Sequence, residues 1–135
     1  MTPGFADTYF FLAIANPADP PHRATREVSV RDPSPLVTTV SVLTELADAM
    51  AAPVNRATFL RLWGRLKHNP TLEVLDPDAD LWSRGLDLYA RRPDNCWSLT
   101  DCISFVVMTD RRHAEALTGD HHLEQAGFRA LLREA

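Results

Sequence analysis

The run LVTTV, Leu36–Val40, limits how this chain can fold more than any other stretch of it. The run follows Pro35 and is dominated by β-branched residues, which is typical of a short buried strand. The next stretch, Val42–Ala51, spaces its apolar residues as one face of a helix, with Ser41 as the expected N-cap and Pro53 as the expected end. A buried strand that leads directly into an amphipathic helix predicts an α/β architecture.

Segments that resemble strands and helices alternate along the chain. The expected strands are Pro3–Asp7, Leu36–Val40, Leu72–Leu75, Ala116–Thr118 and Phe128–Leu132. The other expected helices are Tyr9–Ala15, His22–Val30, Arg56–Lys67, Asp80–Arg92 with Leu81, Leu86, Leu88 and Tyr89 facing inward, Trp97–Met108 with Ser98 as N-cap, and His121–Ala126. This alternation predicts an α/β sandwich with a mainly parallel sheet. The 135 residues contain no internal repeat and no long linker, so we expect one domain over residues 1–135.

The composition favours a globular, soluble protein. Hydrophobic residues make up 45% of the chain and charged residues 24%. No apolar run approaches the roughly 20 residues of a membrane helix, and the N-terminal stretch lacks the basic region of a signal peptide. Cys96 and Cys102 are the only cysteines, too few for a disulfide framework. We therefore expect a cytoplasmic protein without a membrane partner.

Four acidic residues occupy comparable positions in this predicted architecture. Asp7 follows the first strand, Glu45 lies one turn into the helix after LVTTV, Asp101 lies in the first turn of a helix, and Asp120 follows ALT. Ligands of open parallel sheets bind beyond the carboxyl ends of the strands, so these four side chains are candidates to converge there. Converging carboxylates repel one another unless a cation compensates, and oxygen ligands suit Mg²⁺ or Mn²⁺. Such an ion activates water for hydrolysis of phosphodiesters.

Each acid also has a purely structural interpretation. The sequence Ser98–Asp101 is compatible with a capping box, in which the acid stabilises the start of its helix. Asp120 follows Gly119 and is also typical of a turn, whereas Glu45 could face solvent. The spacing of the acids alone does not choose between these interpretations.

Four segments carry a resemblance to a known family: ADTYFFLA, LVTTVSVLTELADAM, WSLTDCISFVVM and ALTGDHHLEQAGF. They resemble PIN-domain ribonucleases, and especially the VapC-like toxins of type II toxin–antitoxin pairs. The resemblance implies a three-layer α/β/α, PIN-like fold and RNA cleavage that depends on Mg²⁺ or Mn²⁺. It also implies that Asp7, Glu45, Asp101 and Asp120 are the catalytic and metal-binding residues. A homodimer and an antitoxin that inserts a basic side chain, typically Arg, are implied in the same way.

The chain departs from the family pattern in places. The first strand is shorter than usual, Leu123 stands where the family often has Phe, and His121 stands where it often has a basic residue. Thr8 and Thr118, each near an acid, are candidates to orient metal ligands, although ordinary capping and strand roles are equally compatible.

Other candidate sites are weaker. A zinc site at His113, His121 and His122 is disfavoured because adjacent histidines on a helix point in different directions, and Cys96 and Cys102 lack a relay that would make either a nucleophile. Asp94 is a candidate fifth acid or a turn residue. The three tryptophans are expected in the core or at interfaces: Trp63, Trp82 and Trp97.

The net charge of −4 by itself argues against nucleic-acid binding. If a metal neutralises the four site acids, however, the net charge of the rest of the chain is about zero. Basic residues then remain for a phosphate-binding rim, or simply as solvated helix faces. They occur as Arg61, Arg65 and Lys67; Arg91 and Arg92; Arg111 and Arg112; Arg129 and Arg133.

The sequence thus favours a metal-dependent endoribonuclease that acts as a toxin on RNA. One alternative is a PIN nuclease of RNA processing, or of structured DNA, without an antitoxin. Another is a non-catalytic module whose acidic pocket binds a basic peptide. A phosphoacceptor receiver domain is disfavoured because the only lysine, Lys67, lies in or just after a helix rather than at the end of a strand.

Overall fold

The computed structural model describes residues 4–15, 35–112, 115–117, 122 and 125–130. The strands are β1 (Gly4–Ala6), β2 (Leu36–Thr39), β3 (Leu72–Leu75), β4 (Glu115–Leu117) and β5 (Arg129–Ala130). The helices are α1 (Thr8–Ala15), α3 (Val40–Ala49), α4 (Pro53–Leu66), α5 (Ala79–Arg91) and α6 (Leu99–Asp110). The strands form one sheet in the order β3-β2-β1-β4-β5, and each neighbouring pair is parallel.

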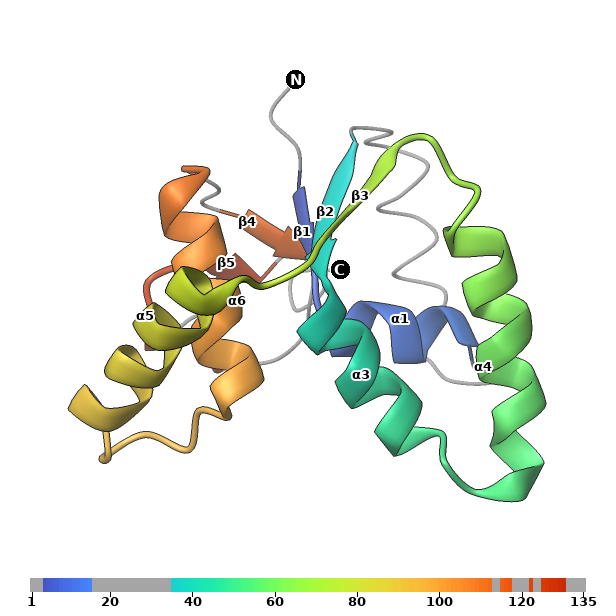
Figure 1. Ribbon diagram of the computed structural model, residues 1–135, viewed down its shortest axis with the longest axis horizontal. Coiled ribbons are helices and arrows are strands. Elements are labelled where there is room, and N and C mark those ends of the chain that lie inside the picture. Colours follow the sequence, from blue (N-terminus) through green and yellow to red (C-terminus); the bar gives the residue numbers. More distant parts are fainter. Residues whose placement is uncertain (1–3, 16–34, 113–114, 118–121, 123–124, 131–135) are drawn as a thin grey trace.

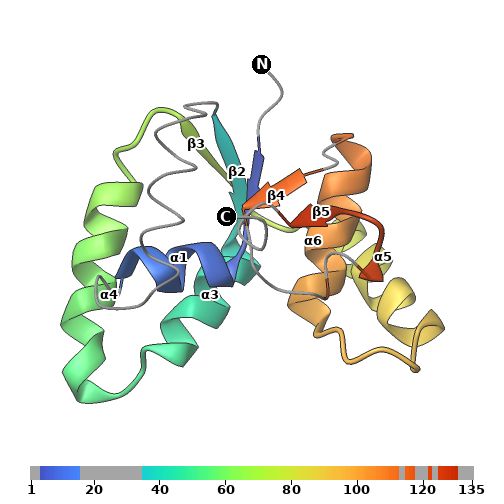
Figure 2. The same cartoon turned by 180° about the vertical axis from the view of Figure 1, so that it is seen from behind.

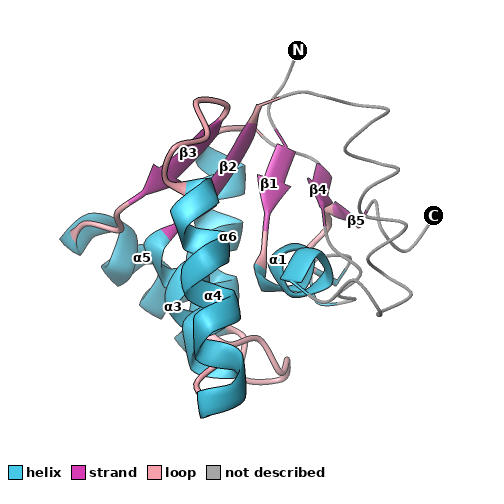
Figure 3. Cartoon of the chain, turned by 90° about the vertical axis from the view of Figure 1, so that its right-hand side faces the viewer, coloured by secondary structure: helices cyan, strands magenta, loops and turns pink. Residues whose placement is uncertain are grey.

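Helices cover both faces of this sheet. In Figure 1, α5 and α6 lie on one side of the strands, and α1, α3 and α4 lie on the other. Figure 2 shows the same division from behind, and Figure 3 shows β1 in the middle of the strands. The predicted three-layer α/β/α arrangement around a parallel sheet is therefore confirmed. That residues 1–135 form a single domain stays a prediction.

The central strand is short but firmly held. β1 has three residues, and its Phe5 and Ala6 are completely buried. It pairs with β2 on one side and with β4 on the other. The buried Thr38 hydroxyl of β2 donates a hydrogen bond to the Ala6 carbonyl oxygen at 2.7 Å. The carboxyl end of β1 is thus fixed by pairing, by packing and by a side-chain hydrogen bond.

Helices on both sides of the sheet complete the core. Phe11 of α1, Leu46 of α3 and Met108 of α6 are each completely buried. Burying a side chain of this size contributes roughly 1.5–3 kcal/mol relative to leaving it in water. The helices that carry the candidate site residues are therefore anchored by their own apolar faces.

The boundaries of two helices differ from those predicted. Ser41 lies inside α3, whose N-cap is Thr39: the Thr39 hydroxyl accepts a hydrogen bond from the Val42 N–H at 3.1 Å. Pro53 does not end a helix but begins α4. Both differences have a simple cause, because Thr caps as Ser does and proline has no N–H to leave unsatisfied at a first helical position.

The inward face of α5 was predicted only in part, because Leu81 and Leu88 pack against the core as expected but Leu86 and Tyr89 do not. Leu86 and Tyr89 are 39% and 50% exposed, whereas Gly85 is buried. A Cβ atom on Gly85 would lie 2.6 Å from Cγ1 of Ile103 in α6 and 3.3 Å from two backbone atoms of that residue. The close approach of α6 at Gly85 selects the buried face of α5 and leaves Leu86 and Tyr89 facing solvent.

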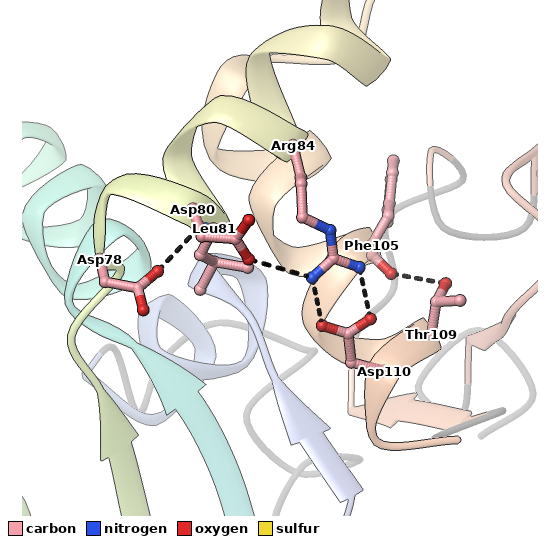
Figure 4. Close-up of polar contacts among 7 residues, drawn as sticks. All are labelled: Asp78, Asp80, Leu81, Arg84, Phe105, Thr109 and Asp110. Atoms are coloured by element: carbon pink, nitrogen blue, oxygen red, sulfur yellow. Dashed lines mark hydrogen bonds and ion pairs between the residues drawn. The ribbon is translucent and has the colours of Figure 1, made fainter.

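An ion pair at the surface also joins α5 to α6 (Figure 4). Both terminal nitrogens of Arg84 donate to the Asp110 carboxylate, at 2.7 and 2.6 Å. The hydrogen bonds from Arg84 lower the pKa of Asp110 below its usual value. Since both side chains are more than 40% exposed, solvent screening keeps the contribution of this pair to stability small. Packing at Gly85 is the stronger constraint on these helices.

Some expected elements cannot be compared with the structure. The helix at His22–Val30 lies outside the described residues, as do parts of the helix at His121–Ala126 and of the strand at Phe128–Leu132. Among the helices that are described, none has the length and apolar character needed to cross a membrane.

We predict that Gly85→Ala lowers the free energy of unfolding by about 1–3 kcal/mol, because the added methyl group overpacks against Ile103. The matched control is Gly64→Ala in α4, where a Cβ atom would meet nothing within 4 Å. There the better helix propensity of alanine should raise stability by up to about 1 kcal/mol. Urea unfolding of both variants checks this, and equal effects of the two substitutions would contradict the packing described here.

Candidate functional site

Asp7 lies between the buried strand β1 and the first residue of α1. Its side chain is largely buried, with 8% of its surface exposed. Its Oδ1 accepts a hydrogen bond from the Phe10 N–H at 3.2 Å, which caps the first turn of α1. The carboxylate is therefore held in place at the carboxyl end of the central strand, where parallel sheets bind their ligands.

Glu45 is tied to the same place by Thr8. The Thr8 hydroxyl, next to Asp7, donates a hydrogen bond to Oε1 of Glu45 at 2.5 Å. This bond joins α1 to α3 across 37 positions of the sequence. Glu45 is half-buried, so the interpretation that it simply faces solvent is wrong. The candidate role of Thr8 in orienting an acid has a physical basis in this contact.

Asp101 belongs to a complete capping box at the start of α6. The Ser98 hydroxyl accepts from the Asp101 N–H at 3.0 Å, and Oδ2 of Asp101 accepts from the Ser98 N–H at 3.1 Å. Nδ1 of His122 lies 3.3 Å from the same Oδ2. The structural interpretation of Asp101 is thus confirmed, but it does not exclude a second role, because a carboxylate offers about four acceptor positions.

An open hollow connects Glu45 with the start of α6. We call it the Glu45 hollow. Its volume is about 420 Å³. Glu45 and Ser41 line it from α3, and Leu99 and Thr100 line it from α6. Thr8, next to Asp7, therefore binds Glu45, and Glu45 shares the hollow with Thr100, whereas Asp7 and Asp101 are not among the residues that line it.

The structure does not assemble a complete metal site from the described residues. Within them, no group of three His, Cys, Asp or Glu side chains is arranged to hold one metal ion. Asp120 lies outside the described residues, as does Thr118. The four-acid site at Asp7, Glu45, Asp101 and Asp120 therefore stays a prediction.

The weaker candidates have other contacts. His122 lies beside Asp101, while His113 and His121 lie outside the described residues. Asp94 lies 3.5 Å from the exposed Arg92 side chain. Trp97 is 6% exposed and its ring packs against Phe105, so its predicted place in the core is confirmed.

The basic clusters differ in how they are paired. Arg91 pairs with Asp87, and Arg111 pairs with Glu73. The cations of the α4 segment, Arg61, Arg65 and Lys67, make no ion pair with another described residue. Of the basic clusters whose side chains the structure describes, this segment therefore keeps the most unpaired positive charge. Arg133 lies outside the described residues.

The position of Trp82 beside the candidate site was not predicted from the sequence. Its side chain is 49% exposed and lines the Glu45 hollow. The apolar spacing of α5 suggested an inward face that includes Leu86 and Tyr89. Gly85, in the middle of the same helix, was the available signal for a close helix contact on a different face.

The two cysteines are in contrasting environments. Cys102 is completely buried beside Asp101, and Cys96 is exposed. Burial first, and the charge of Asp101 second, raise the pKa of the Cys102 thiol to about 11. The thiolate is the reactive form, so Cys102 is inert near neutral pH.

We predict that a thiol reagent at pH 8 modifies one cysteine of the native chain, Cys96, and reaches Cys102 only on unfolding. Because folding raises the pKa of Cys102 from 9.0 to about 11, the stability from its neutral thiol is present below pH 9 and is lost as the pH rises toward 11. Mass spectrometry after labelling identifies the modified residue. Rapid labelling of Cys102 in the native Cys96→Ser variant would contradict its burial.

Comparison with known proteins supports the fold. No protein-family model matches the chain, and no curated protein matches it either. Among solved structures, VapC20 of Mycobacterium tuberculosis, a sarcin-ricin loop cleaving toxin, aligns over 92% of this chain and 95% of its own, with a TM-score of 0.84 and 22% identity. DNA-bound VapBC of Salmonella typhimurium covers 96% and 97% of the two chains, with a TM-score of 0.61 and 16% identity.

A third structure agrees with these two. FitAcB of Neisseria gonorrhoeae aligns over 93% of this chain and 94% of its own, with a TM-score of 0.57 and 19% identity. At these identities the likeness establishes the fold, which is PIN-like as the sequence resemblance implied.

Proposed function

We propose that this chain is a divalent-metal-dependent endoribonuclease and the toxin of a toxin–antitoxin pair. The observation that carries the proposal is the link from Asp7, at the end of the central strand, through the Thr8 hydroxyl to Glu45. It occurs in a chain that shares its PIN-like fold, over 92% of its length, with a toxin that cleaves the sarcin-ricin loop. RNA is accordingly the proposed substrate.

The donor set fits the proposed ion. Asp7, Glu45, Asp101 and Asp120 offer carboxylate oxygens alone, which suit Mg²⁺ or Mn²⁺ better than zinc. The three described acids are at most half-exposed. Brought together with Asp120, as the proposal requires, their charges would repel one another and favour a compensating cation. When bound, the ion activates water for attack on the phosphodiester and neutralises the charge that develops on the phosphate.

The chain's own residues keep the carboxylates in position. Thr8 holds Glu45, and the Phe10 N–H holds Asp7. Asp101 is fixed by its capping box and by the buried face of α6, which includes Cys102 and Phe105. A site that binds a small divalent ion requires such rigid support, because its ligands must keep their geometry.

The proposal includes partners and a location. We infer a cognate antitoxin whose basic side chain enters the acidic site, a homodimer, and action in the cytoplasm. An antitoxin-like reading frame beside the gene would favour this version over a nuclease of RNA processing. A chain that binds a basic peptide but neither metal nor RNA would instead support the non-catalytic alternative.

We predict that Asp7→Asn, Asp101→Asn or Asp120→Asn reduces cleavage of RNA by purified protein to background. Asparagine keeps the cap at Asp7, because it is as good an N-cap residue as aspartate. Thermal melting should therefore show a folded protein, and loss of activity would not be a loss of fold. The matched control is Asp87→Asn on α5, an exposed acid that should leave cleavage unchanged. Full cleavage by the Asp101→Asn variant would refute the proposed chemistry.

We further predict that Thr8→Val weakens Mn²⁺ binding by roughly 10–100-fold, the usual cost of losing a group that orients a metal ligand. Valine has nearly the shape of threonine but cannot donate to Glu45. Thr8→Ser keeps the hydroxyl and should retain most of the affinity. Isothermal calorimetry measures all three proteins, and equal Mn²⁺ affinity in the wild-type chain and Thr8→Val would show that Thr8 does not act through Glu45.

A further inference from the structure

Trp82 lies with half of its surface in solvent, although tryptophan carries one of the largest apolar surfaces of any side chain. It is in the first turn of α5 and is 49% exposed. Tyr89, further along the helix, is equally exposed at 50%, but Trp82 lines the Glu45 hollow and Tyr89 does not. The exposed indole therefore lies beside a proposed catalytic residue.

The lining of the Glu45 hollow restricts what can enter it. Val40, Pro77 and Ile103 contribute apolar surface beside Trp82. The charged side chains among the described lining residues are all acids: Glu45, Asp48 and Asp76. A phosphate group is repelled by such walls, whereas a neutral, flat ring is not. The volume of about 420 Å³ lies in the range of small-ligand sites.

We propose that Trp82 is a stacking platform for an unpaired RNA base next to the phosphate that is cleaved. The inference rests on the proposed function, because it is the ribonuclease reaction that brings RNA to Glu45. Proteins recognise single-stranded RNA by stacking its bases on aromatic side chains. Since Trp82 and Glu45 line one hollow, a base on the indole belongs to a nucleotide close to the cleavage centre. The hydroxyls of Ser41, Thr44 and Thr100 line the same hollow and offer hydrogen bonds to the edge of the base.

The test measures RNA binding separately from cleavage. The probe is a short single-stranded RNA that spans the site at which the wild-type chain cuts total RNA, bound to the Asp7→Asn variant and followed by fluorescence anisotropy. Adding Trp82→Ala should weaken binding by roughly tenfold to a hundredfold, the usual effect of losing one base–aromatic stack. Trp82→Phe should retain most of the affinity because it keeps an aromatic face. Tyr89→Ala, the matched exposed aromatic on α5, should leave the affinity unchanged.

A second measurement identifies the stacked base. Nucleotides of the probe are replaced one by one with abasic ones. At the position of the stacked base, the replacement should weaken RNA binding when Trp82 is present. The same replacement should cause no additional loss of affinity in Trp82→Ala. Unchanged RNA affinity of Trp82→Ala, with native melting behaviour, would overturn the proposal. The proposal would equally be overturned if Trp82→Ala only converted a dimer to a monomer, because this face would then be an interface between copies. Neither result resembles failure of the nuclease assignment, in which the wild-type chain would not cut RNA or the Asp7→Asn variant would still cut it.

Discussion

The burial of β1 is the constraint on which the candidate site depends. A strand of three residues cannot be stable on its own, yet this one lies in the middle of a parallel sheet with Phe5 and Ala6 completely buried. Its neighbours and the Thr38 hydroxyl fix the point at which it ends. The next two residues are Asp7 and Thr8, so the fixed end of β1 determines where their side chains lie. The first strand, although shorter than the family pattern, is therefore held firmly by these contacts.

Hydrogen bonds in the first turns of α1 and α6, and one between α1 and α3, hold three of the acids in place. Asp7 caps α1, Asp101 completes the capping box with Ser98 at the start of α6, and Thr8 restrains Glu45. Capping and metal binding are compatible uses of one carboxylate, because a hydrogen bond from one backbone N–H leaves other acceptor positions on its oxygens. The structural and the functional interpretations of these acids are therefore compatible.

Much of this arrangement was accessible from the sequence because it follows from local patterns. The β-branched run at Leu36–Val40 predicted its strand, and Ser98 with Asp101 predicted a capping box. The exposure of Leu86 and Tyr89 on α5 could not be predicted in the same way, because the contact of α6 at Gly85 decides which face of α5 is buried. The bond between Thr8 and Glu45 spans 37 positions, so no local pattern encodes it. The exposed place of Trp82 beside Glu45 is likewise a consequence of how α3, α5 and α6 meet.

Locating a divalent ion is the most direct test of the proposed four-acid metal site. Crystals of the full chain grown with Mn²⁺, measured at the manganese absorption edge, would show the ion as an anomalous peak. We expect a peak beyond the carboxyl end of β1, about 2 Å from carboxylate oxygens of Asp7 and of Asp101 or Asp120. A fully bound ion elsewhere on the surface, or no peak at this edge of the sheet under saturating Mn²⁺, would contradict the account.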